Sequence, residues 1–147
     1  MKVVLQRVTR AAVRVEGEVV GEIGRGVLLL VGIERGDREE DIESLAERIA
    51  LLRLFQDDGG RMNRSLVDVG GAALVVSQFT LCADLRKGRR PSFDAAEEPA
   101  RAREQVERFQ RALERLGIAT QSGRFGAEMA VELENDGPVT FVLEPRP

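Results

Sequence analysis

The segment Gly26-Val27-Leu28-Leu29-Leu30-Val31-Gly32-Ile33 is a continuous apolar run, because every side chain in it is apolar or absent. A strand with one solvent-facing side alternates apolar and polar residues, whereas a strand covered on both faces is continuously apolar. We therefore expect residues 26–33 to form a strand that is buried on both faces. The run is too short to cross a bilayer as a helix, which needs about 20 apolar residues.

Strands with the alternating pattern precede this central run. Residues 3–8 alternate between two sides and predict a first strand. Residues 11–15 and 19–23 predict two more strands, which the turn residues Glu16-Gly17-Glu18 would join as a hairpin. The N-terminal part of the chain is therefore expected to be entirely β-structure.

Two amphipathic segments after the central run predict helices. The first spans residues 39–54, with Asp37 as its expected N-cap. The second begins near Pro99, where the missing N–H is tolerated, and ends before Gly117. Each helix places its apolar residues on one face, which would consist of Ile42, Leu45, Ala46, Ile49 and Leu52 in the first and of Ala102, Val106, Phe109, Leu113 and Leu116 in the second.

Three further strands complete the predicted secondary structure, at residues 72–80, 129–134 and 139–143. No linker, repeat or low-complexity segment interrupts the chain, so residues 1–147 are predicted to form a single domain. The pattern favours an α+β domain in which two main helices cover a barrel-like layer of mixed and antiparallel β-sheet. The order of the strands in that sheet does not follow from the pattern.

Composition excludes several kinds of chemistry. The chain has no histidine and a single cysteine, which excludes Ser-His-Asp and Cys-His catalysis, histidine zinc sites and cysteine zinc clusters. We therefore expect no metal and no cofactor. The first residues form a strand pattern instead of an apolar secretion signal, so we expect a cytoplasmic protein with no membrane partner. The net charge of −3 argues against coating of nucleic acid but allows a local basic site.

The first motif, Ser77-Gln78-Phe79-Thr80-Leu81, ends an apolar strand with three polar side chains. The pattern alone favours an edge strand that turns toward solvent. The functional alternative places the hydroxyls of Ser77 and Thr80, the Gln78 amide and backbone N–H groups around a reacting carbonyl. Such donors stabilise an oxyanion without any histidine.

The second motif, Asn135-Asp136-Gly137-Pro138-Val139-Thr140, lies between two predicted strands. The pattern alone favours a hairpin turn, since Gly-Pro is a turn signal. The alternative is a cis bond between Gly137 and Pro138, a form that about 5% of X–Pro bonds adopt in folded proteins. A cis bond would present the two carbonyl groups side by side as acceptors for an amino group.

Four positive charges gather in Arg86-Lys87-Gly88-Arg89-Arg90. A solvated loop is the ordinary interpretation of such a run. With an RNA substrate, the same residues become candidates for contacts to phosphate. Cys82 lies nearby without an imidazole to activate its thiol, and we expect it to be a small core residue.

Together, the two motifs resemble the signatures of the D-aminoacyl-tRNA deacylase family, with SQFTL at residues 77–81 and NDGPVT at residues 135–140. The resemblance extends from residue 6 to residue 143. Further matching segments are Gln6-Arg7-Val8, Met62-Asn63-Arg64-Ser65, Asp68-Val69-Gly70-Gly71, Lys87-Gly88, Arg90-Pro91-Ser92-Phe93, and Phe125-Gly126-Ala127 with Met129. Arg89 departs from the smaller polar residue expected there, in a surface-type loop.

The resemblance implies a homodimer with two active sites at the subunit interface. In this family, SQFTL comes from one subunit, and a cis Gly-Pro pair, here Gly137-Pro138, reaches in from the other. Its carbonyls would hold the α-amino group of the substrate so that an L side chain collides, which is selection by exclusion. The implied substrates are D-aminoacyl-tRNA and glycine mischarged on tRNA-Ala, bound through the charged 3′ end.

The resemblance also implies roles for single residues. The backbone N–H of Phe79 is the implied oxyanion donor, and we regard Thr80 as a positioning residue because a threonine nucleophile needs a partner base. Proton transfer is left open between Thr80 and the ribose hydroxyl of the substrate. The other implied contacts are Ser77 and Gln78 in the pocket floor, Arg7 against the Gly-Pro segment, Phe125 and Met129 at the terminal adenosine, and Arg86, Lys87, Arg89 and Arg90 at tRNA phosphates.

We therefore predict a metal-independent hydrolase of D-aminoacyl-tRNA that proofreads chirality in translation and has no DNA partner. One alternative is an RNA-binding or translation-associated module without catalysis, against which the intact SQFTL and Gly-Pro motifs argue. The other is a general small-molecule esterase that uses Thr80 or Ser77. The missing histidine and the missing nucleophile elbow argue against this esterase.

Overall fold

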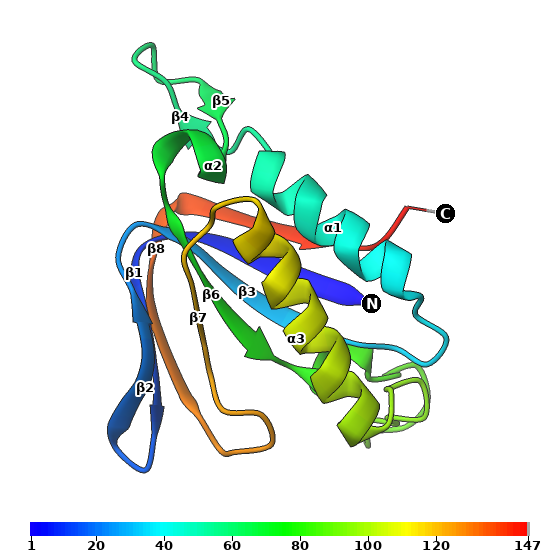
Figure 1. The fold of residues 1–147 in the computed structure, drawn as a ribbon. Helices are drawn as coiled ribbons and strands as arrows, with labels where there is room; N and C mark the ends of the chain where they lie inside the picture. The colour runs from blue at the N-terminus through cyan, green and yellow to red at the C-terminus, as the bar shows by residue number, and fades with distance from the viewer. Residues whose placement is uncertain (147) are drawn as a thin grey trace.

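The computed structural model describes residues 1–146, whose strands form one six-stranded sheet and one small hairpin (Figure 1). The large sheet has the order β2-β1-β3-β6-β7, and β8 pairs with the other edge of β1. The elements are β1 Lys2–Val15, β2 Glu18–Ile23, β3 Gly26–Gly32, α1 Glu39–Leu51, β4 Phe55–Gln56, β5 Met62–Arg64, α2 Leu66–Val69, β6 Ala72–Ser77, the 3-10 helix η1 Phe79–Cys82, α3 Pro99–Arg115, β7 Thr120–Ser122 and β8 Ala130–Leu143.

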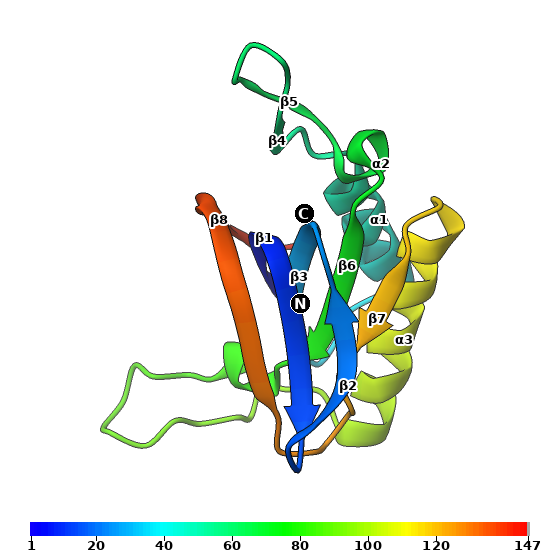
Figure 2. The same ribbon diagram turned by 90° about the vertical axis from the view of Figure 1, so that its left-hand side faces the viewer.

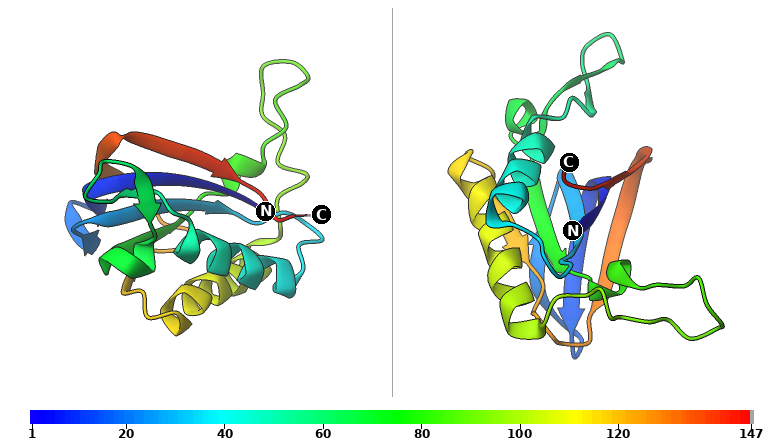
Figure 3. Two further views of the ribbon diagram at one scale, coloured as in Figure 1. Left: turned by 90° about the horizontal axis from the view of Figure 1, so that it is seen from above. Right: turned by 90° about the vertical axis from the view of Figure 1, so that its right-hand side faces the viewer.

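The sheet is mixed and nearly closed, as the sequence predicts. β1 pairs antiparallel with β2, β3 and β8, whereas β6 pairs parallel with β3 and β7. The two ends of the sheet approach each other so closely that a Cβ atom at Gly21 of β2 would collide with the carbonyl oxygen of Ser122 in β7. Helices α1 and α3 lie together on one face (Figures 1 and 3). The predicted α+β class with two main covering helices is therefore confirmed.

The first two predicted strands are in fact one long strand. β1 runs without a break from Lys2 to Val15, and its register against β8 shifts between Gln6 and Val8 and again between Val8 and Arg10. Its first half pairs with β3 and its second half with β2, while β8 follows its other edge. The predicted hairpin is confirmed, since Val15 pairs with Glu18 across the turn.

The last two predicted strands are also one strand. β8 pairs with β1 on both sides of the second motif, with Asn135 opposite Val8 and Thr140 opposite Gln6. Residues 136–139 form a bulge between these pairs, so the hairpin turn that the pattern favoured is wrong. The bond between Gly137 and Pro138 is cis, as in the alternative interpretation.

Details at the ends of three elements differ from prediction. Asp37 does not cap α1, because its carboxylate accepts hydrogen bonds from the backbone N–H of Glu34 at 2.7 Å and from the amino group of Met1 at 2.8 Å. β6 ends at Ser77 instead of residue 80, since the chain then tightens into η1. Leu116, expected on the apolar face of the second helix, is 36% exposed because α3 ends at Arg115.

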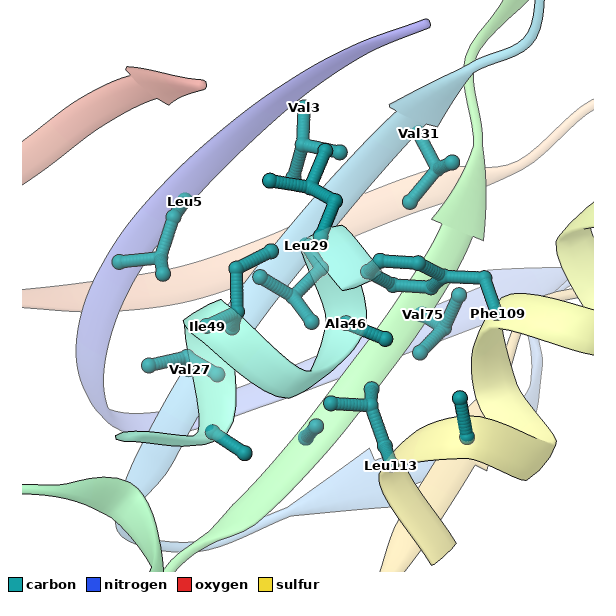
Figure 4. Packing of buried hydrophobic residues seen from close by; sticks show 14 of the residues in the cluster. Val3, Leu5, Val27, Leu29, Val31, Ala46, Ile49, Val75, Phe109 and Leu113 are labelled. Atoms are coloured by element: carbon teal, nitrogen blue, oxygen red, sulfur yellow. The ribbon is translucent and has the colours of Figure 1, made fainter. Parts of the chain in front are cut away.

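The hydrophobic core lies between the sheet and the two long helices. Phe109 and Leu113 of α3 and Ile49 of α1 are completely buried against the alternating side chains of β1 and β3, such as Leu5 and Leu29 (Figure 4). A second cluster, which includes Val8, Val13, Leu74 and Val76, fills the opposite, concave side of the sheet. No helix in residues 1–146 is both long enough and apolar enough to cross a membrane. The central strand β3 is thus covered on both faces, as its apolar sequence predicts.

Candidate active site

The first motif lies at the carboxyl end of β6, where the strand turns into a short helix. The backbone N–H of Gln78 makes the last ladder bond, to the carbonyl of Val31 at 2.8 Å. The N–H of Leu81 then returns to the carbonyl of Gln78 at 3.2 Å and starts η1. Within residues 1–146 the backbone N–H groups of Phe79 and Thr80 have no hydrogen-bond partner, as the first N–H groups of a helix usually do not. The motif therefore presents free main-chain donors.

A cavity of about 710 Å³ opens beside these donors. This size falls within the range of small-molecule binding sites, roughly 300–1,000 Å³. The strand end forms one wall, the loop between β7 and β8 forms another, and the segment that leads into α3 forms the third. The lining residues are Ile33, Arg35, Val76, Ser77, Gln78, Phe79, Phe93, Ala96, Glu97, Glu98, Pro99, Ala102, Phe125, Gly126, Ala127, Met129 and Val131. The structure thus gathers Ser77, Gln78, Phe79, Phe125 and Met129 around one cavity.

Aromatic rings give the cavity flat apolar walls. Phe79 is 55% exposed at the mouth and contacts Phe93 edge-to-face, with ring centroids 5.0 Å apart and planes at 64°. Phe125 contributes a third ring to the lining. Exposed aromatic faces of this kind stack with nucleobases, at about 1–3 kcal/mol per base. The cavity is therefore suited to a planar aromatic group.

The polar groups around the cavity bind and orient more readily than they abstract protons. Glu97 is paired with Arg101 at 3.4 Å, and Glu98 caps α3 by accepting the N–H of Arg101 at 3.2 Å. The hydroxyl of Thr80 accepts a hydrogen bond from the Gln78 side chain, and Thr80 does not line the cavity. Within residues 1–146 this amide is the only side-chain hydrogen-bond partner of the Thr80 hydroxyl, and an amide N–H cannot remove a proton. The geometry thus favours stabilisation of an oxyanion over attack by Thr80.

Arg7 lies behind the Gly-Pro bulge and is 4% exposed. Its Nη1 donates to the carbonyl of Leu54 at 2.6 Å, and its Nε lies 3.2 Å from both the carbonyl and the carboxylate of Asp136. The amide of Asn135 donates to the carbonyl of Arg7 at 2.8 Å and to that of Val139 at 3.1 Å. The bulge is therefore held from both sides by one buried guanidinium and one amide.

The bulge and the cavity lie at opposite ends of the sheet. Arg7 is level with Val27 of β3 and with the start of β6, whereas Ser77 lies four residues farther along β6 and pairs with Val31. Four residues along a strand and three strand spacings correspond to roughly 20 Å. Figure 2 shows the same separation, with the bend of β8 at the top and the end of β6 at the bottom. Neither Gly137 nor Pro138 lines the cavity of its own chain.

The basic run forms the tip of a loop that projects from the domain (Figures 2 and 3). Arg86 is engaged at the base of this loop, where its Nη2 lies 2.7 Å from the carboxylate of Asp84. Hydrogen bonds from Arg86 lower the pKa of Asp84 to about 2. In the described part of the chain, the exposed Lys87, Arg89 and Arg90 form no ion pair. These three side chains remain available to a phosphate group.

Cys82 is 4% exposed, and its thiol lies 3.5 Å from the carbonyl of Ile33. Burial raises the pKa of the Cys82 thiol. The prediction that Cys82 is a small core residue is confirmed. Over residues 1–146, histidine, cysteine and acidic side chains form no group of three that could hold a metal ion.

Comparison with known proteins shows which family the chain belongs to. Residues 4–144 match the D-Tyr-tRNA(Tyr) deacylase family. The chain belongs to this family. The D-aminoacyl-tRNA deacylase of Roseiflexus castenholzii is 58% identical to it over 144 residues, which cover 98% of this chain and 92% of that relative. The D-aminoacyl-tRNA deacylase of Halalkalibacterium halodurans is 57% identical over 98% of this chain and 99% of its own. A deacylase is a hydrolase, so the predicted enzyme class is confirmed.

Two solved structures share this fold. The c-Myc DNA Unwinding Element Binding Protein superposes with a TM-score of 0.92 at 40% identity over the whole of both chains. A probable eukaryotic D-amino acid tRNA deacylase has a TM-score of 0.82 at 19% identity over 97% of both chains, and supports the fold alone. The family and the fold that the motifs predict are thus confirmed.

Several residues that line the large cavity have no role in the sequence interpretation. Phe93 belongs to a segment matched only by resemblance, yet its contact with Phe79 makes it part of the aromatic wall. Arg35 and Glu97 reach the lining because backbone bonds join the end of β3 to the segment before α3, such as Glu97 N–H to Ile33 carbonyl at 3.0 Å. A phenylalanine within an otherwise polar stretch of sequence is a signal that could have identified Phe93.

Proposed function

We propose that this chain hydrolyses the ester bond of D-aminoacyl-tRNA and releases a free D-amino acid and tRNA. The observation that carries the proposal is the position of the free Phe79 N–H at the edge of an aromatic-lined cavity. The terminal adenosine of the tRNA would lie against the cavity wall formed by Phe125 and Met129. The ester carbonyl would then lie at the end of β6, beside Ser77 and Gln78.

In the proposed reaction, water adds to the ester carbonyl, and the resulting oxyanion accepts a hydrogen bond from the backbone N–H of Phe79. The bond to the ribose oxygen then breaks, and the proton that the attacking water gives up reaches that oxygen through the neighbouring ribose hydroxyl or through Thr80. One preorganised oxyanion donor is worth about 10²–10³ in rate. Thr80 positions the site through its hydrogen bond with Gln78. The chain thus supplies orientation and charge stabilisation to an ester that is already activated.

Chirality would be selected by a second copy of the chain. We propose a homodimer in which Gly137-Pro138 of one subunit reaches the cavity of the other and holds the α-amino group with its carbonyls. An L side chain would collide with this main chain, while D-amino acids, and glycine mischarged on tRNA-Ala, would be accepted. The roughly 20 Å between the bulge and its own cavity supports this arrangement. So does the buried Arg7, which holds the bulge in one position.

Subunit mixing tests the cross-subunit site. A Phe79→Pro variant lacks the proposed donor, and a Gly137→Val variant would place side-chain atoms against Val139 and Arg7. If the sites are shared between subunits, mixing the two inactive variants restores about a quarter of the wild-type activity, because half of the random dimers regain one of two sites. No recovery, although mixed dimers form, would contradict the shared site.

We propose that tRNA phosphates contact the tip of the projecting loop. Lys87, Arg89 and Arg90 are the candidates there, whereas Arg86 is engaged by Asp84. Replacing all three by alanine should raise the KM for charged tRNA and reduce its salt dependence. Unchanged values would assign the loop another role. A cytoplasmic location and the lack of a DNA partner remain predictions, and competition by single-stranded DNA tests the latter.

A comparison of two esters separates this proposal from its alternatives. D-Tyr-tRNA and D-tyrosine ethyl ester carry the same acyl group, but only the first fills an adenosine site. We expect rapid hydrolysis of D-Tyr-tRNA and almost none of the ethyl ester. Similar rates on both would support a general esterase. Tight binding of tRNA without hydrolysis would support a binding module.

A further inference from the structure

A second, smaller cavity of about 280 Å³ lies next to the proposed adenosine site. It is located between α3 and the strands β6 and β7, and two of its lining residues, Ser77 and Phe125, also line the large cavity. Phe125 therefore separates two adjoining spaces. A ligand longer than one nucleoside could occupy both at once.

The polar lining of the small cavity differs from that of the large one. Its side chains include Arg103, Glu107 and Gln110 from α3 and Arg124 from the loop between β7 and β8. Arg103 is paired with Glu107 at 3.3 Å on its own helix. Arg124 forms no ion pair with any of residues 1–146. The cavity therefore has one uncompensated positive charge.

The loop that carries Arg124 is firmly attached to the sheet. The N–H of Gly123 donates to the carbonyl of Val75 at 3.1 Å, which extends the pairing of β6 and β7 by one residue. Gly123 also lies so close to Met129 that a Cβ atom would be 2.6 Å from its sulfur. Arg124 thus projects from a fixed position between Gly123 and Phe125, at the boundary of the two cavities.

We propose that the small cavity binds the phosphodiester that joins the terminal adenosine of the RNA to the preceding nucleotide. This inference rests on the proposed function, because it assumes an aminoacylated adenosine in the large cavity. The 5′ side of that adenosine carries a single negative charge, which matches the uncompensated charge of Arg124. Arg103 places a second guanidinium in the same cavity, but its ion pair with Glu107 weakens its attraction for a phosphate.

The test uses two minimal substrates, the D-tyrosyl 3′ ester of adenosine and that of the dinucleotide CpA. The dinucleotide adds the phosphodiester and one nucleoside to the same ester. In the wild-type protein we expect a kcat/KM for CpA about 10-fold above that for adenosine, as for one charge-assisted hydrogen bond. Arg124→Ala should bring this ratio close to one.

Two further variants make the test sharper. Glu107→Gln frees Arg103 and should raise the ratio above its wild-type value. Arg111→Ala is the matched control, since Arg111 is an exposed arginine of α3 that lines neither cavity. Its ratio should stay at the wild-type value. For Arg124→Ala, the KM for CpA should also depend less on salt concentration, because one attraction between opposite charges is lost.

The outcomes distinguish the two proposals. If the wild-type protein hydrolyses both esters with equal kcat/KM, and Arg124→Ala does not alter that equality, the subsite is refuted while the proposed function stands. If Arg111→Ala lowers the ratio as much as Arg124→Ala, the effect is one of general charge, and the subsite is again refuted. If neither ester nor D-Tyr-tRNA is hydrolysed, the proposed function fails, and the subsite fails with it.

Discussion

Replacement of Arg7 by methionine tests how strongly one buried guanidinium holds the Gly-Pro bulge. The change keeps most of the stem but removes every donor. It leaves the carbonyl of Leu54 without the partner that it has at 2.6 Å. It also removes the contacts of Nε with Asp136 at 3.2 Å. Arg7→Lys removes the planar fork but keeps the charge, so it separates the two contributions.

The magnitude follows from the burial of each contact. The Asp136 side chain is 42% exposed, so its ion pair is screened and contributes little. The bond to Leu54 is buried, and losing a hydrogen bond from a charged donor costs about 1.5–3 kcal/mol. We therefore expect Arg7→Met to lower the free energy of unfolding by about 2–4 kcal/mol. This is a large fraction of the 5–15 kcal/mol that is usual for a domain.

The effect on activity should exceed the effect on folding. A displacement of about 1 Å at a substrate-positioning group can reduce the rate about 100-fold. We expect a loss of this order in kcat/KM on D-Tyr-tRNA, measured where urea unfolding shows that the variant is folded. Arg14→Met is the control, because Arg14 lies on the same strand but in an exposed pair with Glu132. Full stability and full activity of Arg7→Met would refute the proposed role of Arg7.

Three further results are expected. The Cys82 thiol should react with iodoacetamide more slowly than free cysteine at pH 8, because burial raises its pKa. Mass spectrometry after timed quenching measures the labelling rate, and immediate labelling would contradict the prediction. Asp84 should titrate with a pKa of about 2, so its ion pair is present above the ordinary value of 3.8 and is lost as the pH falls through about 2. In Arg86→Gln the NMR titration midpoint of Asp84 should move toward 3.8, and an unchanged midpoint would exclude the Arg86 side chain as the cause. Ser65→Ala should lower the free energy of unfolding, measured in urea, by about 1 kcal/mol, since the Ser65 side chain accepts a hydrogen bond from the Asp68 N–H at the start of α2. An unchanged free energy of unfolding would show that this cap does not stabilise the protein.

Local sequence patterns predicted most elements, because helices and strands repeat their apolar residues with different periods. The continuous apolar run became the buried strand β3, and the two amphipathic stripes became α1 and α3. The errors arose where pairing partners from distant parts of the chain decide the outcome. β8 passes through a Gly-Pro sequence as one strand because β1 pairs with it on both sides, and a window of a few residues contains no information about β1.

The site was predicted in part for the same reason. Ser77, Gln78 and Phe79 are adjacent in sequence, and the resemblance linked them to Phe125 and Met129. The position of the Gly-Pro bulge roughly 20 Å away could not be predicted, because it depends on the strand order and register. Arg124 and its cavity also required the fold, since an isolated arginine in a loop has no local signature.

Hydrolysis of aminoacyl-tRNA by this chain should depend on the chirality of the amino acid. The same tRNA is charged in parallel with D-Tyr and L-Tyr, and the loss of each ester is followed with EDTA present throughout. We predict rapid loss of the D ester while the L ester is spared. Equal rates on the two esters would contradict selection by Gly137-Pro138, and stability of both esters would contradict the proposed hydrolase.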